Sequence, residues 1–152
     1  MPEANTPVPA VEGTALAHTD NQGFRTTLDV AGHALVADEP IAVGGTDEGP
    51  SPYGLLSASL AACTAMTLHS YAKMKRLAVR GIRVSVRHEK VHETDCENCE
   101  QDAGAKVDRL ERTITIEGDL ADDVRARMMQ IADRCPVHRT LAAGVRIVTH
   151  AG

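Results

Sequence analysis

Aromatic side chains are almost absent from this chain of 152 residues. It has no Trp, one Phe and two Tyr, so a hydrophobic core must be built from Ala, Val, Leu, Ile and Met. These side chains fill less volume per residue than aromatic rings do. A single domain of this length therefore gains from burying further surface against another subunit, and the composition favours an oligomer.

A basic face and an export signal are also lacking. The chain has 16 Lys and Arg against 21 Asp and Glu, a net charge of −5, and its basic residues are scattered. Since binding to phosphates needs a basic face, the sequence argues against a nucleic-acid-binding protein. No basic segment followed by an apolar stretch opens the chain. We therefore expect a cytoplasmic protein, in which the four Cys are catalytic or metal-bound rather than paired in structural disulfides.

Residues 55–68 form an uncharged segment without Gly or Pro, and Cys63 lies near its centre. A helix that is apolar or small-sided on every face is usually buried, and a segment this short does not cross a bilayer. Ser51 followed by Pro52 is typical of a helix start. The sequence predicts a buried central helix that runs to about Lys75, in a protein that does not span a membrane.

The other elements are predicted from shorter patterns. Alternation predicts a β-hairpin over residues 24–38 with its turn at Ala31-Gly32, and strands at residues 82–86, 110–116 and 145–149. Helices are expected over residues 121–133 and from Cys135-Pro136 onward. Residues 1–22 are predicted to be a flexible leader, which adds at most a short strand in the assembled protein. Residues 23–152 are predicted to form a single domain. The fold class is α+β, with antiparallel sheets around the central helix.

The two thiols at Cys63 and Cys135 differ in what their helices offer them. A thiol in the middle of a helix gains nothing from the helix dipole, so Cys63 is either an inert, buried apolar residue or a thiolate stabilised by a cation from elsewhere. Cys135 stands at a predicted helix start, where free backbone N–H groups favour a thiolate. Taken alone, these residues make Cys135 the candidate nucleophile, with positive charge nearby from Arg134, His138 and Arg139.

Three motifs together resemble those of the OsmC/Ohr family of thiol-dependent peroxidases. They are Gly44-Gly45-Thr46-Asp47 followed by Gly49-Pro50-Ser51-Pro52, then Ala61-Ala62-Cys63-Thr64, and finally Cys135-Pro136-Val137-His138. Their order and spacing agree with the family over about residues 24–150. The resemblance implies an intertwined homodimer in which antiparallel sheets wrap a buried central helix.

The resemblance also implies a reaction that needs no cofactor. The Cys63 thiolate attacks an organic hydroperoxide, releases an alcohol and becomes a sulfenic acid. Cys135 then forms a disulfide with Cys63, and an external dithiol reduces it. This activity belongs to oxidative-stress defence. It assigns the first attack to Cys63 rather than Cys135, because a peroxidatic thiol needs a shaped apolar pocket that a central helix can supply.

The chain departs from the family pattern ahead of the central helix. In the peroxidases a Glu ten residues before the reactive Cys pairs with an Arg from the N-terminal hairpin region, and here that position is Tyr53. Glu48 is a possible substitute for this Glu, and Arg25 is the one Arg before the central helix. His138 and Arg139 complete the candidate site. We expect a divergent branch of the family with slow turnover.

A Cys-x-x-Cys pair, Cys96 and Cys99, lies in a polar segment expected to be a long loop. Such a pair supplies two ligands of a tetrahedral zinc site, and His92 is a candidate third ligand. A redox pair and an ordinary solvated loop are the alternatives. Two functions without catalysis also stay open: a binding module for a small hydrophobic ligand, and an interaction protein stabilised by zinc at this loop.

Overall fold

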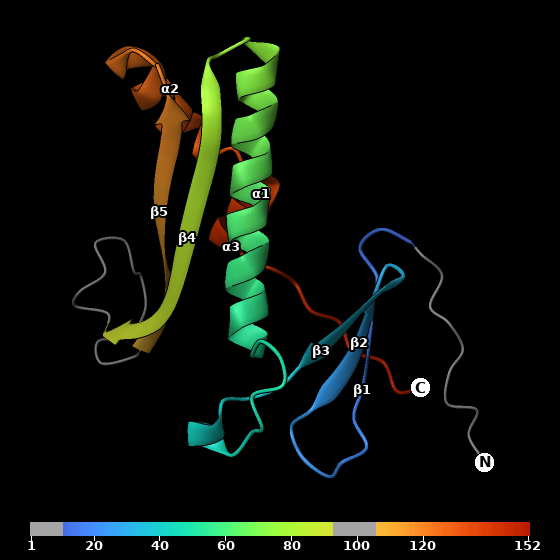
Figure 1. Ribbon diagram of the computed structural model, residues 1–152. Coiled ribbons are helices and arrows are strands. Elements are labelled where there is room, and N and C mark those ends of the chain that lie inside the picture. The colour runs from blue at the N-terminus through green and yellow to red at the C-terminus, as the bar shows by residue number, and fades with distance from the viewer. Residues whose placement is uncertain (1–10, 93–105) are drawn as a thin grey trace. The chain divides into compact units, whose positions relative to one another are not determined.

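The computed structural model describes residues 11–92 and 106–152 of the chain (Figure 1). It divides into two compact units, Met1–Leu55 and Leu56–Gly152. Each unit has its own antiparallel sheet, one of three strands and one of two. Helices and antiparallel strands together confirm the α+β class predicted from the sequence.

The first unit contains the sheet β1-β2-β3, made of β1 (Ala15–His18), β2 (Thr26–Val30) and β3 (His33–Ala37). The hairpin β2-β3 is the one that the alternating pattern predicts, and its turn at Ala31 and Gly32 has positive φ at both residues. Strand β1 pairs antiparallel with β2. Part of the segment predicted as a leader is therefore a strand within the chain itself.

After β3, the chain folds around one buried carboxylate. The Asp38 side chain is only 2% exposed. It accepts hydrogen bonds from the backbone N–H groups of Glu39 (2.7 Å), Thr46 (3.2 Å) and Glu48 (3.2 Å) and from the Thr46 hydroxyl (2.6 Å). These donors hold the pKa of Asp38 below its usual value although burial acts against them, the Thr46 hydroxyl having the largest effect. Asp38 thus fixes the loop that carries Glu48.

Two glycines of this loop are required because other backbone atoms approach them closely. A Cβ atom at Gly45 would lie 1.8 Å from the carbonyl oxygen of Glu39, and one at Gly49 would lie 2.1 Å from that of Val36. No side chain fits at either distance, so both positions need glycine. The short 3-10 helix η1 (Ile41–Val43) lies between Asp38 and these glycines.

Helix α1 (Pro52–Met74) starts and ends close to the positions predicted for the central helix. The Gly54 N–H donates to Ser51 Oγ at 3.1 Å, which confirms Ser51 as the N-cap. The fully buried residues form one stripe at intervals of four, namely Leu60, Thr64, Leu68 and Ala72. Met66, on another face, is 67% exposed. The prediction of a helix buried on every face is therefore not met in the single chain.

In the second unit, β4 (Val79–His92) and β5 (Lys106–Gly118) form a long antiparallel ribbon beside α1 (Figure 1). Both predicted strands are present and are longer than the alternating pattern indicated. The polar segment expected to be a loop is thus part of the ribbon at both ends, and residues 93–105 lie outside the described residues. The described helices include none that is long and apolar enough to cross a membrane.

The core of the second unit is aliphatic, as the scarcity of aromatic residues predicts. Helices α2 (Asp122–Ala132) and α3 (Pro136–Ala143) follow the ribbon, close to their predicted positions. The buried cluster joins α1, β5 and α2, and consists of Leu68, Ala72, Ile116, Met128, Ile131 and Ala132.

The strand predicted over residues 145–149 is wrong for the single chain. Residues 144–152 contain neither helix nor strand, and Val145, Ile147 and Val148 are 62%, 85% and 69% exposed. An alternating sequence becomes a strand only where a sheet edge offers backbone partners. Within the described part of this one chain, no strand pairs with this segment.

Candidate active site

The two thiols that the sequence singles out meet in the second unit. Cys63 lies on the middle of α1, and Cys135 directly precedes α3. Both are free thiols, and they lie close enough for each to shift the pKa of the other. Cys135 is fully buried, whereas Cys63 is partly exposed. One thiol is thus accessible from solvent, and the other is held in direct contact behind it.

Burial and the neighbouring thiol both raise the pKa of Cys63. Burial has the larger effect, because a charged sulfur loses its hydration. The neighbouring Cys135 acts in the same direction, since a second thiol that ionises nearby disfavours a negative charge on Cys63. The Val137 N–H and the Thr67 hydroxyl act in the opposite direction without reversing the shift. Of the two thiols, Cys63 therefore holds its proton more tightly.

Cys135 has a lowered pKa although it is buried. Burial alone raises the pKa of a thiol, but the Cys63 thiol, the Thr64 hydroxyl and two backbone N–H groups stabilise the thiolate by more. The N–H groups are those of Val137 and His138 at the start of α3. They lie near the sulfur without forming a regular capping hydrogen bond. This result agrees with the prediction drawn from the place of Cys135 at a helix start.

The sequence interpretation missed the buried cation of this site, Arg112 on β5. Its side chain is 12% exposed. Its Nη1 donates to Thr64 Oγ1 at 3.0 Å and to the Ala132 carbonyl oxygen at 3.2 Å, and its Nη2 donates to Asp133 Oδ1 at 2.7 Å. The available signal was the alternation itself: Arg112 occupies an inward position between Leu110 and Ile114, where an apolar residue is expected.

The two other predicted residues near Cys135 have different surroundings. The His138 side chain is 34% exposed, and its Nδ1 lies 4.0 Å from Asp133 Oδ1. Its backbone N–H is the part that acts on Cys135. Arg139 is exposed, and its backbone N–H donates to the Cys135 carbonyl oxygen at 3.1 Å. These two side chains lie at the edge of the thiol site rather than against the sulfur.

The predicted site residues ahead of the central helix lie in the first unit. Arg25 Nε donates to the Glu48 carboxylate, and each side chain is 50% exposed. The only Arg before α1 is thus paired with the Glu that the sequence offered as a substitute. Tyr53 lies in the first turn of α1 and is 47% exposed.

The metal prediction concerns residues that the structure describes only in part. His92 is the last residue of β4, whereas Cys96 and Cys99 lie outside the described residues. Within residues 11–92 and 106–152, no group of three or more His, Cys, Asp or Glu side chains is placed to hold a metal ion. The zinc site at the Cys-x-x-Cys pair stays a prediction.

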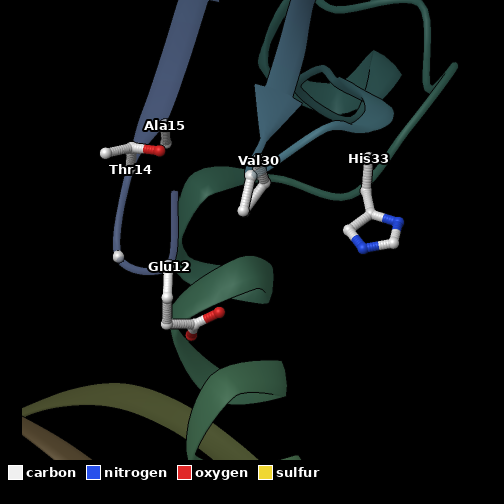
Figure 2. A pocket seen from close by; sticks show the side chains of 7 residues that line it. Glu12, Thr14, Ala15, Val30 and His33 are labelled. Carbon is white, nitrogen blue, oxygen red and sulfur yellow. The ribbon is translucent and has the colours of Figure 1, made fainter. Parts of the chain in front are cut away.

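Two hollows lie away from the thiols. One, of about 480 Å³, is in the first unit, where Glu12 and His33 stand apart from each other on its lining (Figure 2). The other, of about 350 Å³, lies in the second unit between α1 and β4, and Met66, His69 and Arg80 are among its lining residues. Neither hollow is lined by a cysteine.

Known proteins resemble the chain in sequence pattern and in fold. The sequence model of the family described as OsmC-like protein matches residues 45–150. The comparison with curated proteins found no relative. Among solved structures, a putative osmotic stress induced and detoxification response protein from Psychrobacter arcticus is 22% identical, with a TM-score of 0.61. The match covers 83% of this chain and 85% of that one.

Two further structures have the same fold at similar identity. An OsmC-like protein from Mycoplasma pneumoniae is 19% identical with a TM-score of 0.62, over 85% of this chain and 84% of that one. The organic hydroperoxide resistance protein OhrB of Bacillus subtilis is 18% identical with a TM-score of 0.57, over 83% and 87%. The family match covers more than half of the sequence and includes both thiols, so this chain belongs to the OsmC-like protein family.

Proposed function

We propose that this OsmC-like protein reduces organic hydroperoxides, with Cys63 as the attacking thiol and Cys135 as the resolving thiol. The observation that carries the proposal is the pair of neighbouring thiols, in which one member is accessible and the other is buried with a lowered pKa. The Bacillus subtilis structure is that of an organic hydroperoxide resistance protein, which supports the choice of substrate class.

Accessibility, rather than acidity, assigns the first attack. Cys135 is the more acidic thiol, but its side chain is fully buried, and a hydroperoxide cannot reach its sulfur. Cys63 is partly exposed and touches the Cys135 sulfur. Intrinsic nucleophilicity also rises with thiol pKa. Cys63 is therefore the better attacking atom once its proton is removed.

The first step transfers one oxygen to Cys63. Its sulfur attacks the distal oxygen of the hydroperoxide, the O–O bond breaks, and the Cys63 proton ends on the departing alkoxide to give an alcohol. Cys63 is oxidised to a sulfenic acid, and the substrate is reduced. The lowered pKa of Cys135, to which the backbone N–H groups of Val137 and His138 contribute, favours its thiolate for the next step.

The second step forms the disulfide. The Cys135 thiolate attacks the Cys63 sulfur and displaces hydroxide, which leaves as water after taking a proton from solvent. The two side chains are already in contact before the reaction, so little movement is required. An external dithiol then returns both residues to thiols. No cofactor takes part in either step.

Arg25 is the residue proposed to supply positive charge to the leaving oxygen, with Glu48 orienting its guanidinium. This role comes from the family resemblance, and the ion pair within the first unit supports it. Glu48 lies on a loop that is fixed by Asp38, so its carboxylate has a defined place. Tyr53 occupies the position of the family Glu and offers no charge to an Arg, which is consistent with slow turnover.

A cytoplasmic homodimer is the proposed state of the protein. Four cysteines in a chain expected to stay reduced favour the cytoplasm. Exposed apolar side chains on α1 and in residues 145–148 favour a dimer, because burying them against a second copy gains hydrophobic free energy. Met66, Ile147 and Val148 are the most informative of these side chains.

The test is peroxide consumption by the full chain with a dithiol reductant. We expect wild type to turn over cumene hydroperoxide and Cys63→Ser to lose turnover. Without the dithiol, Cys135→Ser should react once and stop as the sulfenic acid. The double variant Cys96→Ser/Cys99→Ser is the matched control and should keep turnover. Peptide mapping after mild oxidation should find a Cys63–Cys135 disulfide. Unchanged turnover in Cys63→Ser would remove the proposal.

A further inference from the structure

Arg112 is a cation on the core-facing side of β5. The position alternates with Leu110 and Ile114, and its side chain is only 12% exposed. A buried guanidinium is costly unless its donors are satisfied. The Arg112 Nη2 donates to the exposed carboxylate of Asp133, and its Nη1 donates to the Thr64 hydroxyl and the Ala132 carbonyl oxygen. The hydrogen bond to Thr64 is the one that connects Arg112 to a thiol, because the Thr64 hydroxyl acts on Cys135.

Thr64 is fully buried beside Cys63 on α1 and has a single hydroxyl proton. That proton has two acceptors within reach. One is the Leu60 carbonyl oxygen at 2.7 Å, and the other is the Cys135 sulfur. The Arg112 Nη1 donates into the hydroxyl oxygen at 3.0 Å and therefore makes the hydroxyl a stronger donor. When Cys135 is a thiolate, the hydroxyl gains most by turning to the sulfur, because an ionised acceptor forms the stronger hydrogen bond.

The charged and titratable groups around Cys135 come from four directions. Cys63 faces it from α1, and Arg112 approaches from β5 through Thr64. Asp133, between α2 and α3, partly neutralises Arg112, and His138 is on the first turn of α3. Of the side chains placed around Cys135, only Arg112 is a permanent cation that is mostly buried, so its charge is screened least by solvent.

We propose that Arg112 is a positioning residue for the resolving thiol, which orients and polarises the Thr64 hydroxyl so that this hydroxyl stabilises the Cys135 thiolate. The chain of donors runs from the guanidinium through the hydroxyl to the sulfur. The resolving role of that thiolate rests on the proposed function, but the donor chain itself does not. The alternative is that Arg112 only ties β5 to the end of α2 through Ala132 and Asp133.

The test measures the ionisation of Cys135 directly in the reduced full chain. Cysteine labelled with 13C at Cβ gives one NMR signal per thiol, each assigned by its Cys→Ser variant, and each signal shifts as the thiol ionises. We expect the Cys135 midpoint to rise by about one pH unit in Arg112→Gln, since a charge-assisted hydrogen bond is lost. Thr64→Val should raise it similarly. Thr64→Ser keeps the hydroxyl and should restore the wild-type midpoint.

The matched control is Arg109→Gln, on the exposed face of the same strand, where Arg109 pairs with Glu89. It should leave the Cys135 midpoint unchanged. If Arg112→Gln does not fold, Arg112→Lys replaces it and should raise the midpoint by a smaller amount, since one ammonium does not match the donor geometry of the guanidinium. An unchanged midpoint in the folded Arg112 variant, or in Thr64→Val, overturns the inference and leaves Arg112 a structural tie.

The titration also separates this inference from the proposed function. It uses no peroxide, so a protein without turnover still shows the Arg112-dependent midpoint if the donor chain exists. If the protein is an active peroxidase but the Cys135 midpoint is unchanged in the Arg112 and Thr64 variants, only the inference is contradicted. Where both hold, stopped-flow measurement at a pH below the wild-type Cys135 midpoint should show that Arg112→Gln slows disulfide formation about tenfold, in proportion to the lost thiolate.

Discussion

Among the arginines that pair with carboxylates, Arg25 in the first unit and Arg112 in the second differ most informatively in their exposure to solvent. Arg25 and Glu48 are each 50% exposed in the first unit. Arg112 is 12% exposed in the second unit, although its partner Asp133 is 65% exposed. Arg25 has one recorded hydrogen-bond partner for its side chain, and Arg112 has three.

This difference in burial predicts different contributions to stability. An exposed ion pair contributes little to folding because water and salt screen it. A buried guanidinium with three acceptors contributes more, because any acceptor left without it loses a hydrogen bond in a place that water reaches poorly. We therefore expect the loss of Arg112 to cost more stability than the loss of Arg25.

The largest expected effect on stability is that of Arg112→Gln. Glutamine is too short to reach Thr64, Ala132 and Asp133 together, and we expect a loss of about 2–3 kcal/mol in the free energy of unfolding. Urea denaturation of the reduced protein measures it. Arg109→Gln, on the exposed face of β5, is the control and should lose well under about 1 kcal/mol. Equal losses in the two variants would contradict the contrast between buried and exposed guanidinium groups.

A smaller effect is expected for Asp38→Asn, and it depends on pH. The pKa of Asp38 is lowered in the folded protein, so its stabilising contribution is complete above the unfolded value of about 4 and is lost as the pH falls through the folded value. Asn keeps an acceptor oxygen but has no charge to lose. We expect Asp38→Asn to lower Tm at pH 7. This difference in Tm from wild type should become smaller toward pH 3.

Thermal unfolding followed by circular dichroism measures this gap at each pH. Asp29→Asn is a control in the same unit, because its carboxylate also accepts a backbone N–H, from Gly32, but at an exposed turn. A gap for Asp38→Asn that stays constant between pH 7 and pH 3 would show that the carboxylate charge does not hold the loop.

The smallest expected effect on stability is that of Arg25→Gln, below about 1 kcal/mol. Its effect on the proposed reaction should nonetheless be large, about ten- to a hundredfold in the second-order rate of Cys63 oxidation, if the charge-assisted contact acts on the transition state. Stopped-flow oxidation and urea denaturation of the same sample measure both quantities. A rate equal to that of wild type would remove Arg25 from the mechanism.

Local patterns in the sequence predicted most elements of the fold. The hairpin, the start of α1 at its Ser51 cap, both strands of the ribbon and helices α2 and α3 were expected near their observed positions. Each depends on residues close together in the chain. The closing strand was wrong because a strand needs a partner, and residues 145–149 alone say nothing about where such a partner lies.

The site was predictable in part. Cys63 and Cys135 were found from their helices and from the family motifs, and the acidity of Cys135 follows from its place before Pro136. Arg112 was not found, because its importance depends on contacts with Thr64 and Asp133 that are 48 and 21 positions away in the sequence. A single inward-facing charge in an alternating strand was the only local sign of it.

The unequal burial of the two thiols has a consequence for the last step of the proposed reaction, the reduction of the disulfide. In a disulfide between them, a reducing thiolate reaches the sulfur of Cys63 more readily, because Cys135 is fully buried. Cys135 is then the leaving group, and a sulfur with a lowered pKa departs faster. A disulfide whose leaving thiolate is already stabilised is also easier to reduce. The same contacts that prepare Cys135 for resolution would therefore make regeneration fast and keep the resting protein in its dithiol form.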